Sequence, residues 1–124
     1  MRLLDCFDLE RLGEEKIFNP LDLKNHRLLW HGSRFSNYVG ILSNGMRIAP
    51  PEAPRHGYAL GKGAYFADLI SKSINYCDTY SSKNIGFLVL CQVALGKCHM
   101  LKSHDSNADI FVKKNYLKVQ STHA

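Results

Sequence analysis

The hydrophobic and polar positions of the chain alternate between short runs typical of strands and spacings typical of helices. The apolar run at residues 27–31 (RLLWH) has the length of a strand. The longest apolar run, residues 85–95, is rich in branched residues and predicts a strand buried on both faces. Weaker patterns predict an edge strand at residues 3–11 and further short strands at 64–68 and 115–120.

Two segments have the spacing of helices instead. Residues 36–45 predict a helix with Ser36 as its N-terminal cap and a left-handed turn at Gly45 as its end. Residues 69–77 return to helical spacing, so their apolar side chains share one face. These apolar residues are Ile70, Ile74 and Cys77.

Between these helices, residues 49–63 (APPEAPRHGYALGKG) read as a loop. The segment holds three of the four prolines and three of the nine glycines, and a loop of this length is usually functional or mobile. Its end resembles the phosphate loop of NTPases but fails the test of spacing. Three residues instead of four separate Gly57 from Gly61, and Gly63 stands where the magnesium-binding Ser or Thr belongs.

Composition narrows the class of protein. With 124 residues, 45% hydrophobic and 22% charged, the chain is one domain or part of one and can bury a core. No run approaches the ~20 apolar residues of a membrane span, and the N-terminus turns acidic too early for a secretory signal. The four cysteines contain no CxxC pair, which favours reduced thiols in the cytosol or nucleus.

The net charge of +5 and the pI of about 9.1 allow two interpretations. Attraction to a polyanion such as nucleic acid or a nucleotide is one, and a modest excess of lysine on an ordinary soluble domain is the other. The basic residues are spread along the chain, and the longest cluster is Lys113–Lys114. Charge alone therefore favours the second interpretation.

Candidate chemistry gathers in three places. His31 and Gly32 end the first strand, and a glycine there lets a flat ligand approach the backbone. Tyr65 follows a tight glycine turn, and Ser73 and Tyr76 are three residues apart on the predicted helix. Two aromatic rings, a hydroxyl and an open backbone suit a planar aromatic amide.

Each of these residues also has a structural interpretation. A lone histidine after an apolar run is more often a structural residue, and the two tyrosines taken singly are more often packing residues. No carboxylate stands near His31 to orient it for a Ser–His hydrolase. A metal site is not predicted, because four candidate ligands fit the spacing of no common zinc module. These candidates are Cys91, Cys98, His99 and His104.

Three motifs in order give the chain a specific resemblance. The motifs are RLLWHGSRFSNYVGILSNGMRIAPPEAP at 27–54, GYALGKGAYFADLISKSINYC at 57–77 and CQVALGKC at 91–98. With ERLGEE upstream, they resemble the catalytic domain of the poly(ADP-ribose) polymerases, nearest its DNA-damage-responsive branch. The resemblance implies an α+β class and the ADP-ribosyltransferase fold, with two small mixed or antiparallel sheets and flanking helices. The whole chain, residues 1–124, would then be a single partial catalytic domain.

The resemblance implies that NAD is the co-substrate and assigns residues to its nicotinamide end. His31 matches the histidine that holds a ribose hydroxyl, and Gly32 the glycine whose backbone clasps the carboxamide. Ser73 matches the serine bonded to that amide. Tyr76 matches the ring stacked on nicotinamide, and Tyr65 the second aromatic wall. His31 and Tyr65 are the expected catalytic residues.

Further residues match the adenosine and diphosphate end of NAD in the same family. These residues are Ser33, Asn37, Gly40 and Arg47. Arg47 suits this side as a permanent cation, and Gly40 suits it because a side chain there could crowd the ligand. Residues 50–63 match the family's loop over the donor site. The implied partners are NAD and protein acceptors, and the implied location is nuclear, with a cytoplasmic one as the alternative.

One part of the family's pattern is absent. Its catalytic glutamate lies near the end of the domain, whereas all four glutamates of this chain precede Tyr65. They are Glu10, Glu14, Glu15 and Glu52. Asp105 and Asp109 come too early to replace it. We therefore expect a fragment or a truncated product, with weak or no transferase activity if the chain is complete.

Two alternatives to the transferase stay open at this stage. The first is a binding module that holds NAD or ADP-ribose without turnover. The second is a basic nucleic-acid-binding domain, which predicts DNA binding that weakens with salt. The family's DNA-sensing modules are not part of these residues, so DNA contact is expected only through modules outside this chain.

Overall fold

The fold is built on two separate pairs of strands with short helices around them. The computed structural model describes residues 1–16, 19, 23–49, 58–115 and 118–121. In chain order, the elements are η1 (Glu14–Lys16), β1 (His26–Gly32), η2 (Phe35–Asn37), α1 (Tyr38–Asn44), α2 (Ile70–Ile74), η3 (Thr79–Ser82), β2 (Leu88–Ala94), β3 (Cys98–Leu101), α3 (Ala108–Asn115) and β4 (Lys118–Ser121). The predicted α+β class with two small sheets is confirmed.

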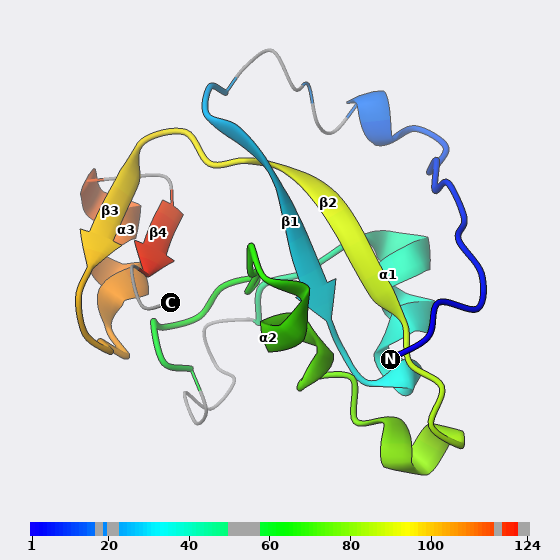
Figure 1. The fold of residues 1–124 in the computed structure, drawn as a ribbon. Coiled ribbons are helices and arrows are strands. Elements are labelled where there is room, and N and C mark those ends of the chain that lie inside the picture. Colours follow the sequence, from blue (N-terminus) through cyan, green and yellow to red (C-terminus); the bar gives the residue numbers. More distant parts are fainter. Residues whose placement is uncertain (17–18, 20–22, 50–57, 116–117, 122–124) are drawn as a thin grey trace.

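The central sheet pairs β1 with β2 in antiparallel register. His26 faces Ala94 at one end and Gly32 faces Leu88 at the other. Figure 1 shows this pair between α1 on one side and the group of β3, α3 and β4 on the other. None of the helices in the described part of the chain has the length and apolarity that crossing a bilayer requires.

The segment predicted as a strand at 64–68 contributes only one bridge to this sheet. The backbone N–H of Trp30 donates to the carbonyl of Ala67 at 2.7 Å, and the N–H of Ala67 donates back to Trp30 at 2.9 Å. This pair of bonds fixes the chain next to the open edge of β1. The prediction of a full strand there is wrong, because one reciprocal pair does not extend into a ladder.

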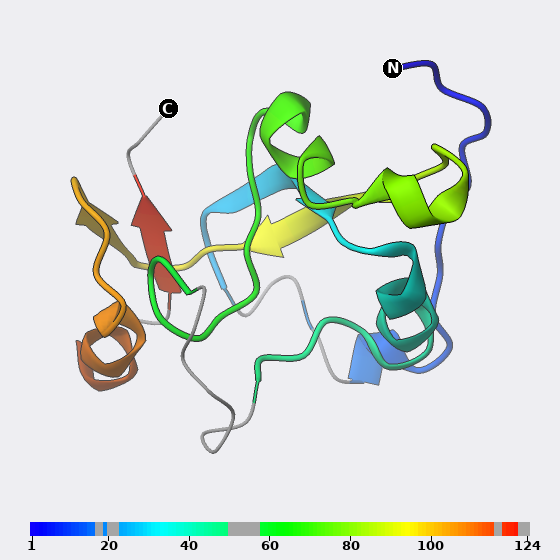
Figure 2. The same cartoon turned by 90° about the horizontal axis from the view of Figure 1, so that it is seen from below.

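Strand β2 is less buried than its apolar sequence predicts. Val93 and Ala94 at its end are buried together with Leu95, whereas Leu90 keeps 47% of its surface exposed. Burial on both faces requires a layer of side chains on each face. In Figure 2, α2 lies above the strand pair and α1 lies below and to one side, so neither helix covers the whole of β2.

The predicted edge strand at residues 3–11 is wrong. Residues 1–10 have no regular secondary structure and are exposed; Leu3 and Phe7, for example, keep about three quarters of their surface. An alternating pattern favours a strand only where a partner supplies the hydrogen bonds and a core covers the apolar side. Neither is present around this segment in the described residues.

The predicted helix at 36–45 divides into η2 and α1. Its end is confirmed, since Gly45 has a φ of +76° and its N–H donates to the Ile41 carbonyl at 2.9 Å. Its beginning is not, because Ser36 lies within η2 and makes no N-terminal cap. The residue before α1 is Asn37, whose side chain makes no capping hydrogen bond either.

Helix α2 is shorter than the predicted 69–77. It ends at Ile74, and the chain continues as turns, with the Cys77 N–H donating to Ile74 at 3.0 Å. Cys77 is buried as the apolar spacing predicts. Of the predicted loop at 49–63, residues 50–57 lie outside the described residues.

A second, unforeseen unit follows β2. Strands β3 and β4 pair in parallel, Cys98 with Lys118 through Leu101 with Ser121, and α3 connects them. Parallel strands need such a crossover, since a tight turn only joins antiparallel ones. The prediction of a strand at 115–120 is confirmed in β4, whereas β3 and α3 were not predicted. The first turn of α3 is buried at Ala108 and Asp109.

Candidate functional site

Strand β1 carries the first candidate residues at its last two positions. The ring nitrogen Nδ1 of His31 lies 2.8 Å from the backbone oxygen of Tyr65. A carbonyl oxygen only accepts hydrogen bonds, so Nδ1 carries the proton. In the neutral imidazole, Nε2 is then an acceptor, which suits a hydroxyl donor from a ligand.

Helix α2 brings Ser73 against the same strand end. Its Oγ donates to the carbonyl of Trp30 at 3.0 Å, and the side chain is 3% exposed. A Cβ on Gly32 would lie 1.9 Å from the Ser73 carbonyl oxygen. The helix can therefore approach the strand this closely only with glycine at position 32. This is a second reason for glycine there, besides the open backbone inferred from the sequence.

The Tyr65 hydroxyl is fixed on both sides by backbone. It accepts the N–H of Leu60 at 3.0 Å and donates to the carbonyl of Gly61 at 2.5 Å. Burial, the largest effect, raises the pKa of the Tyr65 phenol, and the nearby Tyr58, Asp109 and Tyr76 act in the same direction. With 37% of the residue exposed, the phenol is anchored while part of the side chain stays open.

Tyr76 lies in the turn after α2 and not on the helix itself. Its N–H donates to the Ser73 carbonyl at 3.1 Å, and 63% of the residue is exposed. The structure thus brings five of the predicted residues together, although they come from three separate segments. We name them the β1–α2 cluster: His31, Gly32, Tyr65, Ser73 and Tyr76.

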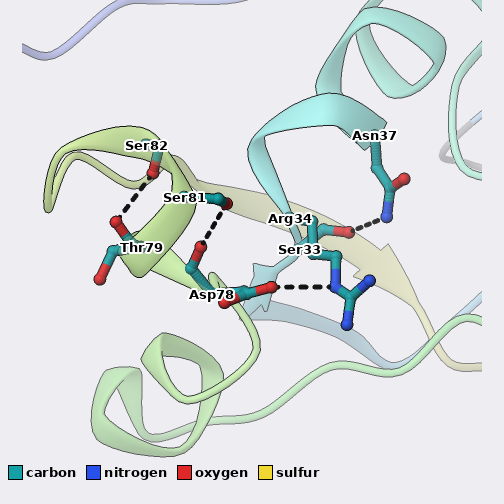
Figure 3. A network of polar contacts seen from close by, with 7 residues as sticks. All are labelled: Ser33, Arg34, Asn37, Asp78, Thr79, Ser81 and Ser82. Atoms are coloured by element: carbon teal, nitrogen blue, oxygen red, sulfur yellow. Dashed lines mark hydrogen bonds and ion pairs between the residues drawn. The ribbon is translucent and has the colours of Figure 1, made fainter.

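The remaining predicted residues form what we name the η2–α1 side: Ser33, Asn37, Gly40 and Arg47. Asn37 Nδ2 donates to Ser33 Oγ at 2.9 Å, as Figure 3 shows. Gly40 lies on α1 with open space where a side chain would be, and Arg47 is exposed beyond the end of α1. The contacts described above do not connect Gly40 or Arg47 with the β1–α2 cluster.

A hollow next to this side was not predicted from the sequence. It has a volume of about 660 Å³ and lies between η2 and η3. Arg34 and Asp78 meet in its wall, with Nε 3.2 Å from Oδ2 (Figure 3). Ser81 Oγ donates to the Asp78 carbonyl at 3.4 Å. Arg34 and Asp78 are far apart in sequence and follow no period, so no signal in the sequence indicated that they meet.

The sequence also contained no indication of two buried charged residues next to the site. Lys62 is 5% and Asp109 is 6% exposed, and both lie near the turn that holds Tyr65. Neither stands in an apolar periodic pattern, so sequence alone gave no reason to expect their burial.

The cluster combines a ring acceptor, a buried hydroxyl and two partly exposed phenol rings. These groups suit a planar aromatic amide joined to a sugar, because rings stack on the plane while the acceptor and hydroxyl orient the polar groups. Among the described residues, no three His, Cys, Asp or Glu side chains gather as a metal site requires.

Comparison with known proteins gives a family match over the whole chain. The family described as "Poly(ADP-ribose) polymerase catalytic domain" matches residues 1–124. The chain is 57% identical over 109 residues to human poly [ADP-ribose] polymerase 2, and these residues are 88% of this chain and 18% of that protein.

Relatives in other organisms give similar values. Poly [ADP-ribose] polymerase 1 from Danio rerio is 56% identical over 99 residues, which is 79% of this chain and 10% of that protein. The Arabidopsis thaliana poly [ADP-ribose] polymerase 1 is 53% identical over 103 residues, 82% of this chain and 10% of that protein. The chain thus spans less than a fifth of the length of these relatives.

Proposed function

Because the chain belongs to the poly(ADP-ribose) polymerase catalytic domain family, we propose that it forms the NAD-binding part of an ADP-ribosyltransferase. The enzyme transfers ADP-ribose from NAD to protein acceptors and releases nicotinamide. The observation that carries this proposal is the pair of hydrogen bonds from His31 to Tyr65 and from Ser73 to Trp30. They join three distant segments at one strand end.

Each residue of the β1–α2 cluster has a proposed task at the nicotinamide end. The Ser73 hydroxyl donates to Trp30, so its oxygen keeps lone pairs that accept from the amide N–H of nicotinamide. Tyr76 stacks on the pyridine ring, and Tyr65 forms the opposite wall. Nε2 of His31 accepts a hydrogen bond from a ribose hydroxyl. The backbone of Gly32 supplies the remaining contact to the amide.

The η2–α1 side is proposed to take the rest of the dinucleotide. Ser33, Asn37 and Arg47 contact its adenosine and diphosphate, and Gly40 leaves space for the ligand. Gly40 fits this task because open space surrounds the position of its absent side chain. Arg47 fits because it is exposed and always charged.

The reaction replaces one bond at the anomeric carbon of the nicotinamide ribose by another. The bond to the nicotinamide nitrogen breaks, and its electron pair leaves with neutral nicotinamide. An acceptor oxygen forms the new bond and loses its proton. The residues of the cluster contribute by holding the ring and the ribose in one orientation, which lowers the entropic part of the barrier.

A specific observation favours a second candidate, a module that binds NAD or ADP-ribose without turnover. No glutamate follows Glu52 in the 124 residues, so they contain no counterpart of the glutamate that activates the acceptor in the family. Nicotinamide released from NAD, measured by chromatography, separates the candidates. Release that a His31→Ala, Tyr65→Ala variant loses supports the transferase, and binding without release supports the binding module.

Calorimetric titration with benzamide and with NAD tests the site itself. We expect Tyr76→Ala to lower the affinity for both ligands at least about fivefold, since stacking contributes roughly 1 to 3 kcal/mol per ring. Tyr76 is 63% exposed, so the melting temperature should change little. Tyr80→Ala is the matched control, because Tyr80 is 94% exposed and outside the cluster. Equal affinities in the two variants would contradict the proposed site.

We propose a nuclear location on the same family resemblance. A fluorescent fusion of the full-length protein, imaged with a DNA stain, tests the location; uniform cytoplasmic signal would contradict it. DNA binding by the 124 residues alone, weakened by salt, would instead support a nucleic-acid-binding domain.

A further inference from the structure

The turn that anchors Tyr65 is itself held from behind by the segment that begins α3. The Tyr65 hydroxyl contacts Leu60 and Gly61, and Ala59 and Gly61 form a bridge across the turn. The N–H of Asp105 donates to the Ala59 carbonyl at 3.0 Å. The orientation of the Tyr65 ring therefore depends on residues about 45 positions later in the chain.

Asp109, from the same later segment, also lies against the turn. A Cβ built on Gly61 would lie 2.1 Å from Oδ1 of Asp109, so the carboxylate occupies the space that a side chain at position 61 would need. Gly61 has a φ of +78°, which glycine adopts without strain. The backbone of the turn at Gly61 therefore packs directly against the Asp109 carboxylate, with no space for a side chain between them.

The burial of Asp109 requires an explanation beyond helix formation. An acidic side chain in the first turn of a helix is favourable because of the helix dipole, but this holds equally for an exposed carboxylate. Asp109 is only 6% exposed, and burying a carboxylate is costly unless its contacts compensate. Besides starting α3, Asp109 packs against Gly61 in the Tyr65 turn, which an ordinary exposed helix-start residue does not do.

We propose that Asp109 is a positioning residue for Tyr65. By packing against Gly61, it fixes the carbonyl that accepts the Tyr65 hydroxyl, and thereby the plane of the phenol ring. That this ring borders a nicotinamide pocket rests on the proposed function; that Asp109 orients the ring does not. Asp109 touches no reacting atom and has no catalytic role in this proposal.

The first test follows the Tyr65 ring directly by NMR in protein labelled with ¹³C-tyrosine. The Tyr65 signal is assigned through its loss in Tyr65→Phe. At neutral pH, where the phenol stays protonated, Asp109→Asn should shift the Tyr65 ring signal, because the Gly61 carbonyl that holds the hydroxyl is no longer fixed. The lost charge also lowers the pKa of Tyr65, and the titration reads that effect separately. The signal of exposed Tyr80 should stay unchanged. Asp8→Asn, the same change on an exposed side chain in residues 1–10, is the matched control.

The outcome separates positioning from simple stabilisation. A merely structural Asp109 would lower the melting temperature and leave the Tyr65 ring signal of the folded protein at neutral pH unchanged. An unchanged ring signal in Asp109→Asn, or an equal shift in Asp8→Asn, would overturn the proposal. Asp109→Asn keeps the size of the side chain, so it is the variant expected to fold even where Asp109→Ala does not.

The second test measures benzamide affinity in these variants and in Asp109→Ala. We expect Asp109→Ala to lower the affinity roughly tenfold, because a small displacement of a positioned group weakens its contacts with the ligand. Combined with Tyr65→Phe, Asp109→Asn should lower the affinity no further than one change alone, since both act through one hydroxyl. Additive losses would overturn the proposed route.

The two proposals fail in different ways. If the unaltered protein binds no benzamide while Asp109→Asn still shifts the Tyr65 ring signal at neutral pH, the nicotinamide pocket is wrong and the positioning role stands. If the unaltered protein binds benzamide and Asp109→Asn changes neither the Tyr65 ring signal nor the affinity, the positioning role is wrong and the pocket stands.

Discussion

The β1–α2 cluster and the η2–α1 side are proposed to hold two ends of one ligand, but they are built in opposite ways. The cluster joins three segments of the chain, and its Ser73 and Gly32 are in close contact with backbone. The η2–α1 side consists of residues from one continuous stretch, 33–47. Its contacts are short-range, such as that from Asn37 to Ser33.

This difference separates folding from binding. A residue in the cluster serves both, because the hydrogen bonds that bring the segments together involve the residues that would face the ligand. On the η2–α1 side, Gly40 and Arg47 are exposed and contribute little packing. We therefore expect substitutions of the closely packed cluster residues Gly32 and Ser73 to lower stability and affinity together, and substitutions on the other side to lower affinity without a loss of stability.

The pair Gly32→Ala and Gly40→Ala tests this difference with one chemical change. At position 32, the new Cβ would collide with the Ser73 carbonyl oxygen, which should cost about 3 kcal/mol or more of stability. At position 40, nothing obstructs the new methyl, and alanine in a helix should stabilise by about 0.5 to 1 kcal/mol. Urea unfolding measures both changes.

A Gly32→Ala variant as stable as the unaltered protein would contradict the close approach of α2. Under the proposed function, Gly40→Ala should nevertheless weaken NAD binding, so this substitution raises stability and lowers affinity, whereas Gly32→Ala lowers both.

Alkaline pH tests the residue that connects the two regions. Tyr38 begins α1, is 3% exposed and donates its hydroxyl hydrogen to the Phe87 carbonyl at 2.7 Å. Burial, followed by the neighbouring Cys77, raises the pKa of Tyr38 to about 12. The folded state thus favours the neutral phenol. The contribution of Tyr38 to the free energy of unfolding is therefore fully present below pH 10 and is lost as the pH rises to 12.

The expected loss over this range is about 2 to 3 kcal/mol. Urea unfolding at closely spaced pH values measures it, and Tyr38→Phe should remove most of this dependence. Burial also raises the pKa values of Cys77 and Cys91, which leaves a smaller loss in the same direction. A Tyr38→Phe protein with the full alkaline loss would show that Tyr38 is not its source.

Serine substitutions on the two sides should differ by a smaller amount. Ser73→Ala removes a buried hydrogen bond to Trp30 and should cost about 1 kcal/mol of stability, together with benzamide affinity. Ser33→Ala removes the contact with Asn37 near the surface and should change stability by less than about 0.5 kcal/mol. Thermal unfolding with and without benzamide measures the stability and the affinity of each variant. Equal effects of the two substitutions would contradict the proposed difference between the β1–α2 cluster and the η2–α1 side.

The ion pair between Arg34 and Asp78 should have the smallest effect. Both side chains are exposed, 71% and 46%, and water screens such pairs. The coupling energy from Arg34→Gln, Asp78→Asn and the double variant should stay below about 0.5 kcal/mol and vanish in 1 M salt. Asn at position 78 keeps the left-handed backbone at little cost, since Asp78 has a φ of +46°. A larger, salt-resistant coupling would indicate a more buried pair.

The predictions from sequence that are confirmed depend on local chemistry. The apolar runs located β1 and β2, and Gly45 located the end of α1. The predictions that are wrong needed a partner that the local sequence does not reveal. Residues 3–11 alternate like a strand, but no described strand pairs with them, and β2 lacks a covering layer on part of its surface.

The candidate site shows the same division. The motifs named every residue of the β1–α2 cluster, but the reason for Gly32 came only from its distance to Ser73. The hollow at Arg34 and Asp78 and the burial of Asp109 against Gly61 had no sequence signal, because their residues are too far apart to form a periodic pattern.

The sequence by itself determined the class of fold, the family and the chemical types of the candidate residues, since periodicity, turn residues and motifs are properties of neighbouring positions. Only the tertiary structure decided that the proton on Nδ1 of His31 is donated to the Tyr65 carbonyl and that α2 packs against β1 at Gly32. It alone also placed the segment that begins α3 against the turn that holds Tyr65. These are contacts between distant segments, and their geometry follows from the packing of the whole chain.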